Sequence, residues 1–251
     1  SINAASGTTL TLQNNRRDGL MLQRAAGAFL RGTTTTSNNG ENGITLGSTS
    51  SADIAGTTLV QNNVSGGIDL NRASTLLAAG DFSVVRNGDS GIIVNQGSSL
   101  RFIDGTIIID GNTNHGLFVL RESEARLGPS AATFEAQIRN NTGQGILVTE
   151  QSYVRVEAGT VLRNNLASGL QARRNSGIVA FNISVTANSR HGLDADDSSV
   201  EINNSTISGN TLADVMATFG TRLSLNGTNT IGQRPITCDA TVLSRGSTVC
   251  P

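Results

Sequence analysis

One eight-residue pattern recurs nine times along the chain: an asparagine, three variable residues, a glycine, then two apolar residues separated by one variable position. The clearest copy runs from Asn141 to Val148. We call the glycine the anchor; it stands at Gly19, Gly43, Gly67, Gly91, Gly116, Gly145, Gly169 and Gly192, and Asp214 takes the ninth place. Anchors are about 24 residues apart. A repeat of this length cannot bury its own apolar side, so the pattern predicts a solenoid in which coils stack on one another.

Each repeat contains three short segments with strand-like periodicity. Apolar residues one and three places after the anchor, as in Ile146 and Val148, mark a strand with one buried face. A second inward row lies seven places before the anchor, and stretches such as Leu100–Phe102 and Val154–Val156 supply a third strand. Since crossovers between parallel strands are almost always right-handed, we predict an all-β, single-stranded right-handed parallel β-helix of about nine coils.

The asparagine four places before the anchor is present in all nine repeats. It stands at Asn15, Asn39, Asn63, Asn87, Asn112, Asn141, Asn165, Asn188 and Asn210. Asparagine tolerates a left-handed turn, and stacked identical amides can donate to one coil while accepting from the other. We therefore expect an asparagine ladder along one corner. The anchor glycine predicts a second corner that needs either positive φ or close approach of the backbone.

The repeats predict one domain over residues 1–251: an N-terminal edge over 1–9, coils over 10–231, and a C-terminal cap over 232–251. The first coil lacks a capping helix, so a preceding segment or residues 1–9 should cover that end. Cys238 and Cys250, the only cysteines, are predicted to form a disulfide that closes the cap. A disulfide implies an oxidising compartment, and no apolar run of 18 residues is present, so we expect a secreted, periplasmic or cell-surface protein.

Composition limits the choice of partner. The formal net charge is −1 and only 15% of residues are charged, which argues against nucleic acid as a partner. All 18 basic residues are arginine. Sugar-binding grooves usually offer flat rings for stacking, and the chain has no tryptophan, seven phenylalanines and one tyrosine, Tyr153, which argues against strong glycan binding.

The densest ionisable cluster falls in coils seven and eight. Arg173 and Asp196 hold the same place after their anchors, so we expect a salt bridge between them. His191 and Asp194 lie close by in the sequence, and paired carboxylates can serve acid–base chemistry or bind a cation. These four residues are the candidate ligand-binding site. We expect no metal or other cofactor, with calcium as the one alternative left open.

A second candidate surface is apolar. Ile93, Phe118 and Leu147 hold the same outward position on three consecutive coils, and Leu120 extends the patch. Exposed apolar surface of this kind usually marks a partner interface or is covered by a neighbouring segment. Coil five has five extra residues between Leu120 and Ile138, in the stretch Arg121–Ser130. A covering insertion is the alternative explanation for the patch.

The nine Asn-x3-Gly-(Ile/Leu)-x-apolar units resemble the repeats of the pectate-lyase-like superfamily of right-handed parallel β-helices. The resemblance covers nearly the whole chain and implies a secreted or surface protein that cleaves, epimerises or binds acidic polysaccharide. The catalytic motifs of its enzymes do not match: Asn112-Thr113 is followed by asparagine, Asp196-Asp197 comes after His191 instead of before it, and no aspartate precedes a proline. The absence of lysine excludes lyases that use it as the base, whereas arginine-based lyases remain open.

From these observations we predict an extracellular, non-enzymatic structural or binding module that uses the face of coils four to eight for a polysaccharide or protein partner. One alternative is an enzyme, a lyase or hydrolase acting on acidic glycans through the Asp194 cluster. Another is a trimer of the kind formed by phage tailspikes. Fold alone does not choose among these functions.

Overall fold

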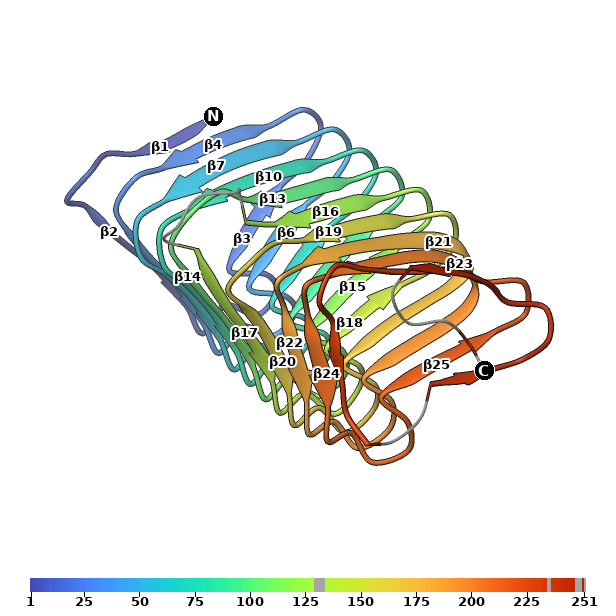
Figure 1. Cartoon of the computed structure of the whole chain (residues 1–251). Coiled ribbons are helices and arrows are strands. Elements are labelled where there is room, and N and C mark those ends of the chain that lie inside the picture. The colour runs from blue at the N-terminus through green and yellow to red at the C-terminus, as the bar shows by residue number, and fades with distance from the viewer. Residues whose placement is uncertain (129–133, 234–235, 247–249, 251) are drawn as a thin grey trace.

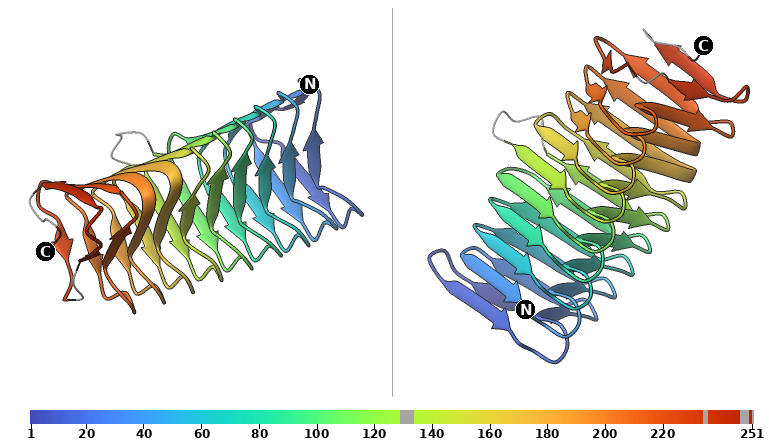
Figure 2. Two further views of the ribbon diagram at one scale, coloured as in Figure 1. Left: turned by 90° about the vertical axis from the view of Figure 1, so that its right-hand side faces the viewer. Right: turned by 90° about the horizontal axis from the view of Figure 1, so that it is seen from below.

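The chain winds into one parallel β-helix in a computed structural model that describes residues 1–128, 134–233, 236–246 and 250 (Figure 1). Each coil contributes one strand to each of three sheets, and every pair of neighbouring strands is parallel. The coils stack side by side into an elongated rod with the two termini at opposite ends (Figure 2). No helix occurs in the described part of the chain, so none is present there that could cross a membrane.

The first sheet contains the strands that follow the anchors. It consists of β3 (Leu20–Leu22), β6 (Ile44–Leu46), β9 (Ile68–Leu70), β12 (Ile92–Asn95), β15 (Leu117–Leu120), β18 (Ile146–Val148), β25 (Val215–Thr218), β28 (Thr237–Cys238) and the first parts of β21 (Leu170–Phe181) and β23 (Leu193–Asn203). The long strands β21 and β23 continue into the second sheet, so hydrogen bonds join both sheets into one of 19 strands.

The second sheet lies next along each coil. It consists of β1 (Ile2–Ala4), β4 (Gly27–Leu30), β7 (Ser51–Ala55), β10 (Thr75–Ala79), β13 (Ser99–Phe102), β16 (Glu124–Leu127), β19 (Tyr153–Val156), the later parts of β21 and β23, β26 (Arg222–Asn226) and β29 (Leu243–Gly246).

The third sheet, of 10 strands, completes each coil. It consists of β2 (Thr9–Gln13), β5 (Thr33–Ser37), β8 (Thr58–Gln61), β11 (Phe82–Val85), β14 (Thr106–Asp110), β17 (Glu135–Arg139), β20 (Thr160–Arg163), β22 (Ser184–Thr186), β24 (Thr206–Ser208) and β27 (Thr230–Ile231).

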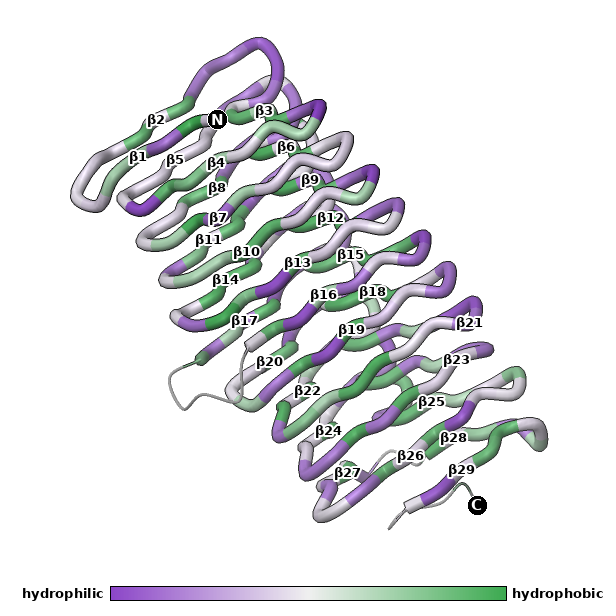
Figure 3. Tube along the Cα trace, turned by 90° about the horizontal axis from the view of Figure 1, so that it is seen from above, coloured by the Kyte–Doolittle hydropathy of each residue, from purple (hydrophilic) through white to green (hydrophobic). Residues whose placement is uncertain are grey.

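Burial follows the predicted rows. The residues one and three places after each anchor, such as Ile68 and Leu70, point inward and are fully buried in most coils. The row seven places before the anchor is buried as well, as at Val84 and Ile138. These side chains form one hydrophobic cluster that runs the length of the rod. Figure 3 shows the hydrophobic stretches repeating along the strands from coil to coil, with hydrophilic turns between them.

Both ends extend the β-helix beyond the nine repeats seen in the sequence. At the N-terminus β1 pairs with β4, so residues 2–4 are already a strand of the second sheet. At the C-terminus β28 pairs with β25 and β29 pairs with β26, so the predicted cap continues the first and second sheets. The sequence pattern missed these segments because terminal coils lack the asparagine and the anchor that identify a repeat.

The predicted asparagine ladder is confirmed. From Asn15 to Asn188, each ladder asparagine donates from its backbone N–H and its side-chain Nδ2 to the Oδ1 of the next one, at 2.9–3.2 Å. The left-handed conformation, however, belongs to the residue before the ladder asparagine, as at Asn38 and Asn140. At the end of the row Asn210 donates instead to the Oδ1 of Asp214, at 3.0 Å from Nδ2.

The anchor glycines are required for close approach and not for positive φ. None of them has a positive φ. A Cβ atom on Gly169 would lie 2.3 Å from a methyl carbon of Val185 and 2.7 Å from Nδ2 of Asn188 in the next coil. The anchor therefore marks the corner where the ladder amide and the adjacent core side chain leave no room for a side chain.

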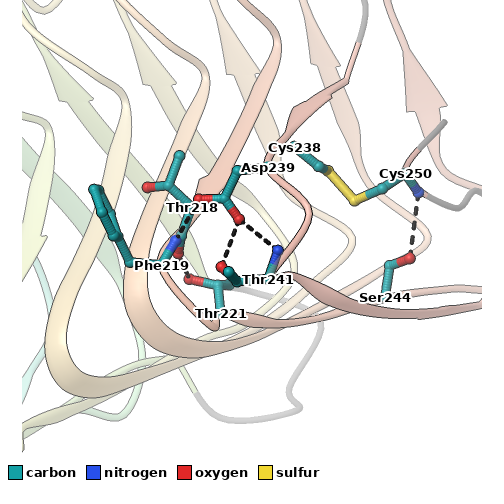
Figure 4. The surroundings of a disulfide bond; sticks show 8 residues. All are labelled: Thr218, Phe219, Thr221, Cys238, Asp239, Thr241, Ser244 and Cys250. Carbon is teal, nitrogen blue, oxygen red and sulfur yellow. Dashed lines mark hydrogen bonds between the residues drawn. A yellow bond between two sulfur atoms is a disulfide. The ribbon is translucent and has the colours of Figure 1, made fainter.

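The disulfide between Cys238 and Cys250 fastens the last coil (Figure 4). Nearby, the Asp239 carboxylate accepts hydrogen bonds from the backbone N–H groups of Phe219 and Thr241, at 2.8 and 2.9 Å. These contacts tie the end of β28 back to the turn that follows β25. The C-terminal segment is therefore held by a covalent bond and by polar contacts with the preceding coil.

Candidate functional site

The ionisable cluster predicted from the sequence lies on the outward face of the first sheet. Register on β21 and β23 places Gln171 beside Asp194 and Arg173 beside Asp196, and His191 lies just before β23. The Gln171 side chain donates from Nε2 to Asp194 Oδ2 at 2.7 Å. The structure thus brings all four candidate residues to one face of neighbouring coils.

The prediction of a salt bridge between Arg173 and Asp196 is wrong. The two residues are paired in register, yet no ion pair joins them, and Arg173 Nε is buried without a hydrogen-bond partner among the described residues. Register places the two backbones side by side, but it does not fix the direction of a long arginine side chain. Nδ1 of His191 is also buried and unpaired.

Two residues of the cluster have shifted pKa values. Burial raises the pKa of Asp196, and the neighbouring charges of Asp194 and Asp197 raise it further while Arg173 lowers it. Burial also lowers the pKa of His191, against the opposing effect of Asp194. Perturbed pKa values of this kind are frequent at functional sites. Within the described residues no group of three His, Cys, Asp or Glu side chains is arranged to hold a metal ion.

A chain of hydrogen bonds extends the cluster toward the N-terminus. Gln144 donates from Nε2 to Gln171 Oε1 at 2.8 Å, and its backbone N–H donates to His115 Nδ1 at 3.2 Å. Burial is the main cause that lowers the pKa of His115 to about 4, so its imidazole is neutral at physiological pH. With Asp194 at the other end, a continuous polar stripe crosses four coils of the first sheet.

The apolar patch is smaller than the sequence suggested. Leu147 is only 2% exposed and Leu120 is 9% exposed, whereas Ile93 and Phe118 are half-buried. The Phe118 ring packs edge-on against His115, with 5.0 Å between ring centroids. Neighbouring outward side chains therefore cover most of this apolar surface, and the hypothesis of a partner interface rests on Ile93 and Phe118.

The coil-five insertion is described only in part. The residues at 129–133, including the predicted Pro129 and Ser130, are outside the described part of the chain. The part of the insertion that the structure describes, residues 121–128, contains β16 of the second sheet.

The outward face of the second sheet carries a site that the sequence analysis did not identify. Arg101, Arg126 and Arg155 occupy the same position on β13, β16 and β19, and the register pairs each with the next. With Tyr153 and Glu124 they line a hollow of about 290 Å³. Three guanidinium groups thus rise from consecutive strands, about 4.8 Å apart at the backbone. We call this site the arginine groove.

A buried carboxylate holds two of these arginines in place. Glu157, whose side chain is 7% exposed, accepts from Arg155 Nε at 2.6 Å and from Arg126 Nη2 at 3.1 Å. The Arg155 guanidinium also lies over the ring of Phe181, 4.7 Å from its centroid. Arg101 is exposed and has no hydrogen bond or ion pair within the described residues, so it is available to an anion.

Tyr153 supplies an aromatic surface beside the arginines. It is 41% exposed, and its ring lies against Gly177, where an added Cβ atom would be 3.0 Å from the ring. Burial raises the pKa of the phenol, which therefore stays protonated and can donate a hydrogen bond. The arginine groove consequently combines cationic donors, a flat ring and a phenol.

The signal for this groove was present in the sequence as three apolar-arginine-apolar triplets: Leu100–Phe102, Ala125–Leu127 and Val154–Val156. Their spacing equals that of the anchors in the same coils. In each triplet the two apolar residues are buried and mark the strand, and the arginine between them points outward. The scarcity of aromatic residues pointed away from a sugar site, although the single tyrosine lies in the groove.

These observations define a class of protein: a parallel β-helix with polar and charged stripes on two outward faces. The family model described as "Right handed beta helix region" matches residues 1–128 and 90–237. The chain therefore belongs to the right-handed β-helix family.

Three solved structures are similar to this chain. A crystal structure of the periplasmic alginate epimerase AlgG is 15% identical and has a TM-score of 0.50, over 99% of this chain and 77% of that one. The A-module of the Azotobacter vinelandii mannuronan C-5 epimerase AlgE4 is 11% identical with a TM-score of 0.49, over 98% and 90% of the two chains. The AlgE6 A-module is 12% identical with a TM-score of 0.45, over 95% and 91%. No curated protein sequence matches the chain. At such identity the likeness concerns the fold alone.

Proposed function

We propose that this chain is a secreted, periplasmic or cell-surface module that binds acidic polysaccharide in the arginine groove. The observation that carries the proposal is the stacking of Arg101, Arg126 and Arg155 on consecutive strands, beside the exposed ring of Tyr153. The disulfide between Cys238 and Cys250 supports a location outside the cytosol.

The chemistry of the groove favours a carboxylated sugar chain over a neutral one. A guanidinium presents parallel N–H donors that match both oxygens of a carboxylate. Because Glu157 already orients Arg126 and Arg155, binding an anion costs less side-chain entropy than it would with mobile cations. The Tyr153 ring can pack against the apolar face of a pyranose.

The first test is calorimetric titration with two polymers. One is alginate, an acidic polysaccharide that appears in the name of a structurally similar epimerase, and the other is a neutral glucan. We expect binding of the acidic polymer alone. Arg101→Gln should weaken binding about tenfold, the equivalent of about 1.4 kcal/mol for one charge-assisted contact. Arg163 is exposed on β20 of the third sheet, so Arg163→Gln is the matched control.

Two results would contradict the proposal. Equal affinity for the neutral and acidic polymers would show that the arginines do not select the ligand. Equal losses in the Arg101 and Arg163 variants would show that binding follows overall charge and not the groove.

Catalysis on an acidic glycan is the second candidate function, and the first-sheet cluster favours it. Arg173 Nε and His191 Nδ1 are buried and have no hydrogen-bond partner among the residues that the structure describes, and burial together with the charge of Asp194 raises the pKa of Asp196. Buried polar atoms without partners are costly, and a bound ligand is one way to satisfy them. Incubation with acidic polysaccharides should then shorten or modify them, and an Asp194→Asn, Asp196→Asn double variant should abolish the change. Unaltered turnover in that variant would remove these residues from consideration.

A further inference from the structure

A second arginine-lined hollow lies near the C-terminal end of the second sheet. It measures about 480 Å³ and is formed by β23, β26 and β29. Arg222 and Arg245 line it, both are exposed, and neither has a hydrogen bond or an ion pair within the described part of the chain. The hollow therefore presents two unneutralised guanidinium groups.

Glu201 is the one carboxylate among the residues that line this hollow. Its Oε1 accepts hydrogen bonds from Asn203 Nδ2 at 3.2 Å and from Asn226 Nδ2 at 3.1 Å. The two amides hold the carboxylate on the sheet surface, away from an ion pair with either arginine. With two cations and one anion, the hollow keeps a net positive charge.

The two hollows belong to the same face and the same row. Strand register places Arg101, Arg126, Arg155, Val179, Glu201, Ser224 and Arg245 at equivalent positions on successive strands. Arg101 and Arg245 are six strand steps apart, which corresponds to roughly 29 Å along the rod at the usual strand spacing. A ligand that contacts both must be an extended chain that runs parallel to the β-helix axis.

The surface between the hollows is suited to sugar rings. It presents Tyr153, Gly177, Val179 and Phe181, of which Gly177 leaves space for the tyrosine ring and Phe181 lies beneath Arg155. Gly177 and Val179, which the register places beside Tyr153 and Arg155, carry no charge. Along the rod axis this face therefore has a cationic region at each end and an aromatic and aliphatic region between them.

We infer that the second hollow is a distal subsite for the same linear acidic polysaccharide, which lies along the second sheet and contacts the arginine groove with one part and Arg222 and Arg245 with another. This inference rests on the proposed function, because the groove supplies the first contact. Once one part of the chain is bound, the other part meets the distal hollow at a high effective concentration. Affinity should thus rise steeply when the ligand becomes long enough to span both hollows.

The test is titration with size-graded acidic oligosaccharides whose extended lengths lie below and above this span, at an ionic strength of about 0.15 M. We expect spanning oligomers to bind at least tenfold more tightly than shorter ones. An Arg222→Gln, Arg245→Gln double variant should lose this gain and bind short oligomers as the unmodified protein does. Arg101→Gln should weaken binding of short and long oligomers alike, and Arg163→Gln serves as the control.

The outcomes separate this inference from the proposed function. If short oligomers bind and longer ones bind no better, or if the double variant keeps the gain, the distal subsite is refuted while the groove remains. If the double variant weakens short and long oligomers equally, the C-terminal hollow is the primary site and the inference is again refuted. No binding at any length would overturn both proposals.

Discussion

Replacing Asn141 by alanine should be among the most destabilising single substitutions in this β-helix. Its side chain accepts two hydrogen bonds from Asn112, each at 3.0 Å, and donates to the carbonyl of Ile109 at 3.3 Å and to Asn165 Oδ1 at 3.0 Å. Truncation leaves two buried donors of Asn112 without acceptors. An unsatisfied buried group costs about 1–3 kcal/mol, so for the two donors we expect a loss of about 2–6 kcal/mol.

The matched control is Asn15→Ala, at the exposed start of the same ladder. The Asn15 side chain donates to Asn39 Oδ1 at 2.9 Å, and that oxygen also accepts from the Asn15 backbone N–H, which the substitution keeps. The expected loss is about 1 kcal/mol or less. Urea unfolding followed by circular dichroism gives both values. Similar losses at the two positions would refute the reasoning that buried, fully paired amides stabilise the stack.

Two further predictions concern protonation and packing. The pKa of His115 is about 4 in the folded protein and about 6.5 in the unfolded chain. Between these pH values only the unfolded chain binds the proton, so the neutral imidazole contributes stability fully above pH 6.5, and this contribution is lost as the pH falls to about 4. His115→Gln should remove this pH dependence, worth up to about 3 kcal/mol, in unfolding measured across that range; an unchanged slope would contradict it. Gly169→Ala should lower the free energy of unfolding by about 1–3 kcal/mol through overpacking. Gly27→Ala should be nearly neutral, because the nearest atom to an added Cβ there is 3.8 Å away. Equal melting temperatures for the two variants would argue against the close approach at Gly169.

The two stripes raise different questions. On the first sheet His115, Gln144, Gln171 and Asp194 bond to one another, so much of their hydrogen-bonding capacity is already used within the protein. In the two hollows of the second sheet Arg101, Arg222 and Arg245 have no such partners in the described residues. This contrast is the reason that we assign ligand binding to the second sheet and keep catalysis on the first sheet as the second candidate.

The sequence by itself determined the parallel β-helix, the inward rows, the asparagine ladder and the disulfide. These features could be predicted because burial imposes a strict choice on each repeat: an exposed Ile68, or an unpaired Asn112 amide inside the stack, would cost several kcal/mol in every such coil. Nine copies of the same constraint make the pattern visible within one chain. The incomplete coils at the two ends were missed because they carry only part of that pattern.

The tertiary structure alone decided which outward residues share a site. Outward positions experience no common burial constraint, so an equal place after the anchor shows which residues can be neighbours but not which of them form a site. Arg101, Arg126 and Arg155 form one groove because strand register places them on the same row, and Glu157, which directly follows β19, is buried against Arg126 and Arg155. The absence of a salt bridge between Arg173 and Asp196 shows the same limit, since register fixes backbone neighbours while the directions of the side chains depend on everything packed around them.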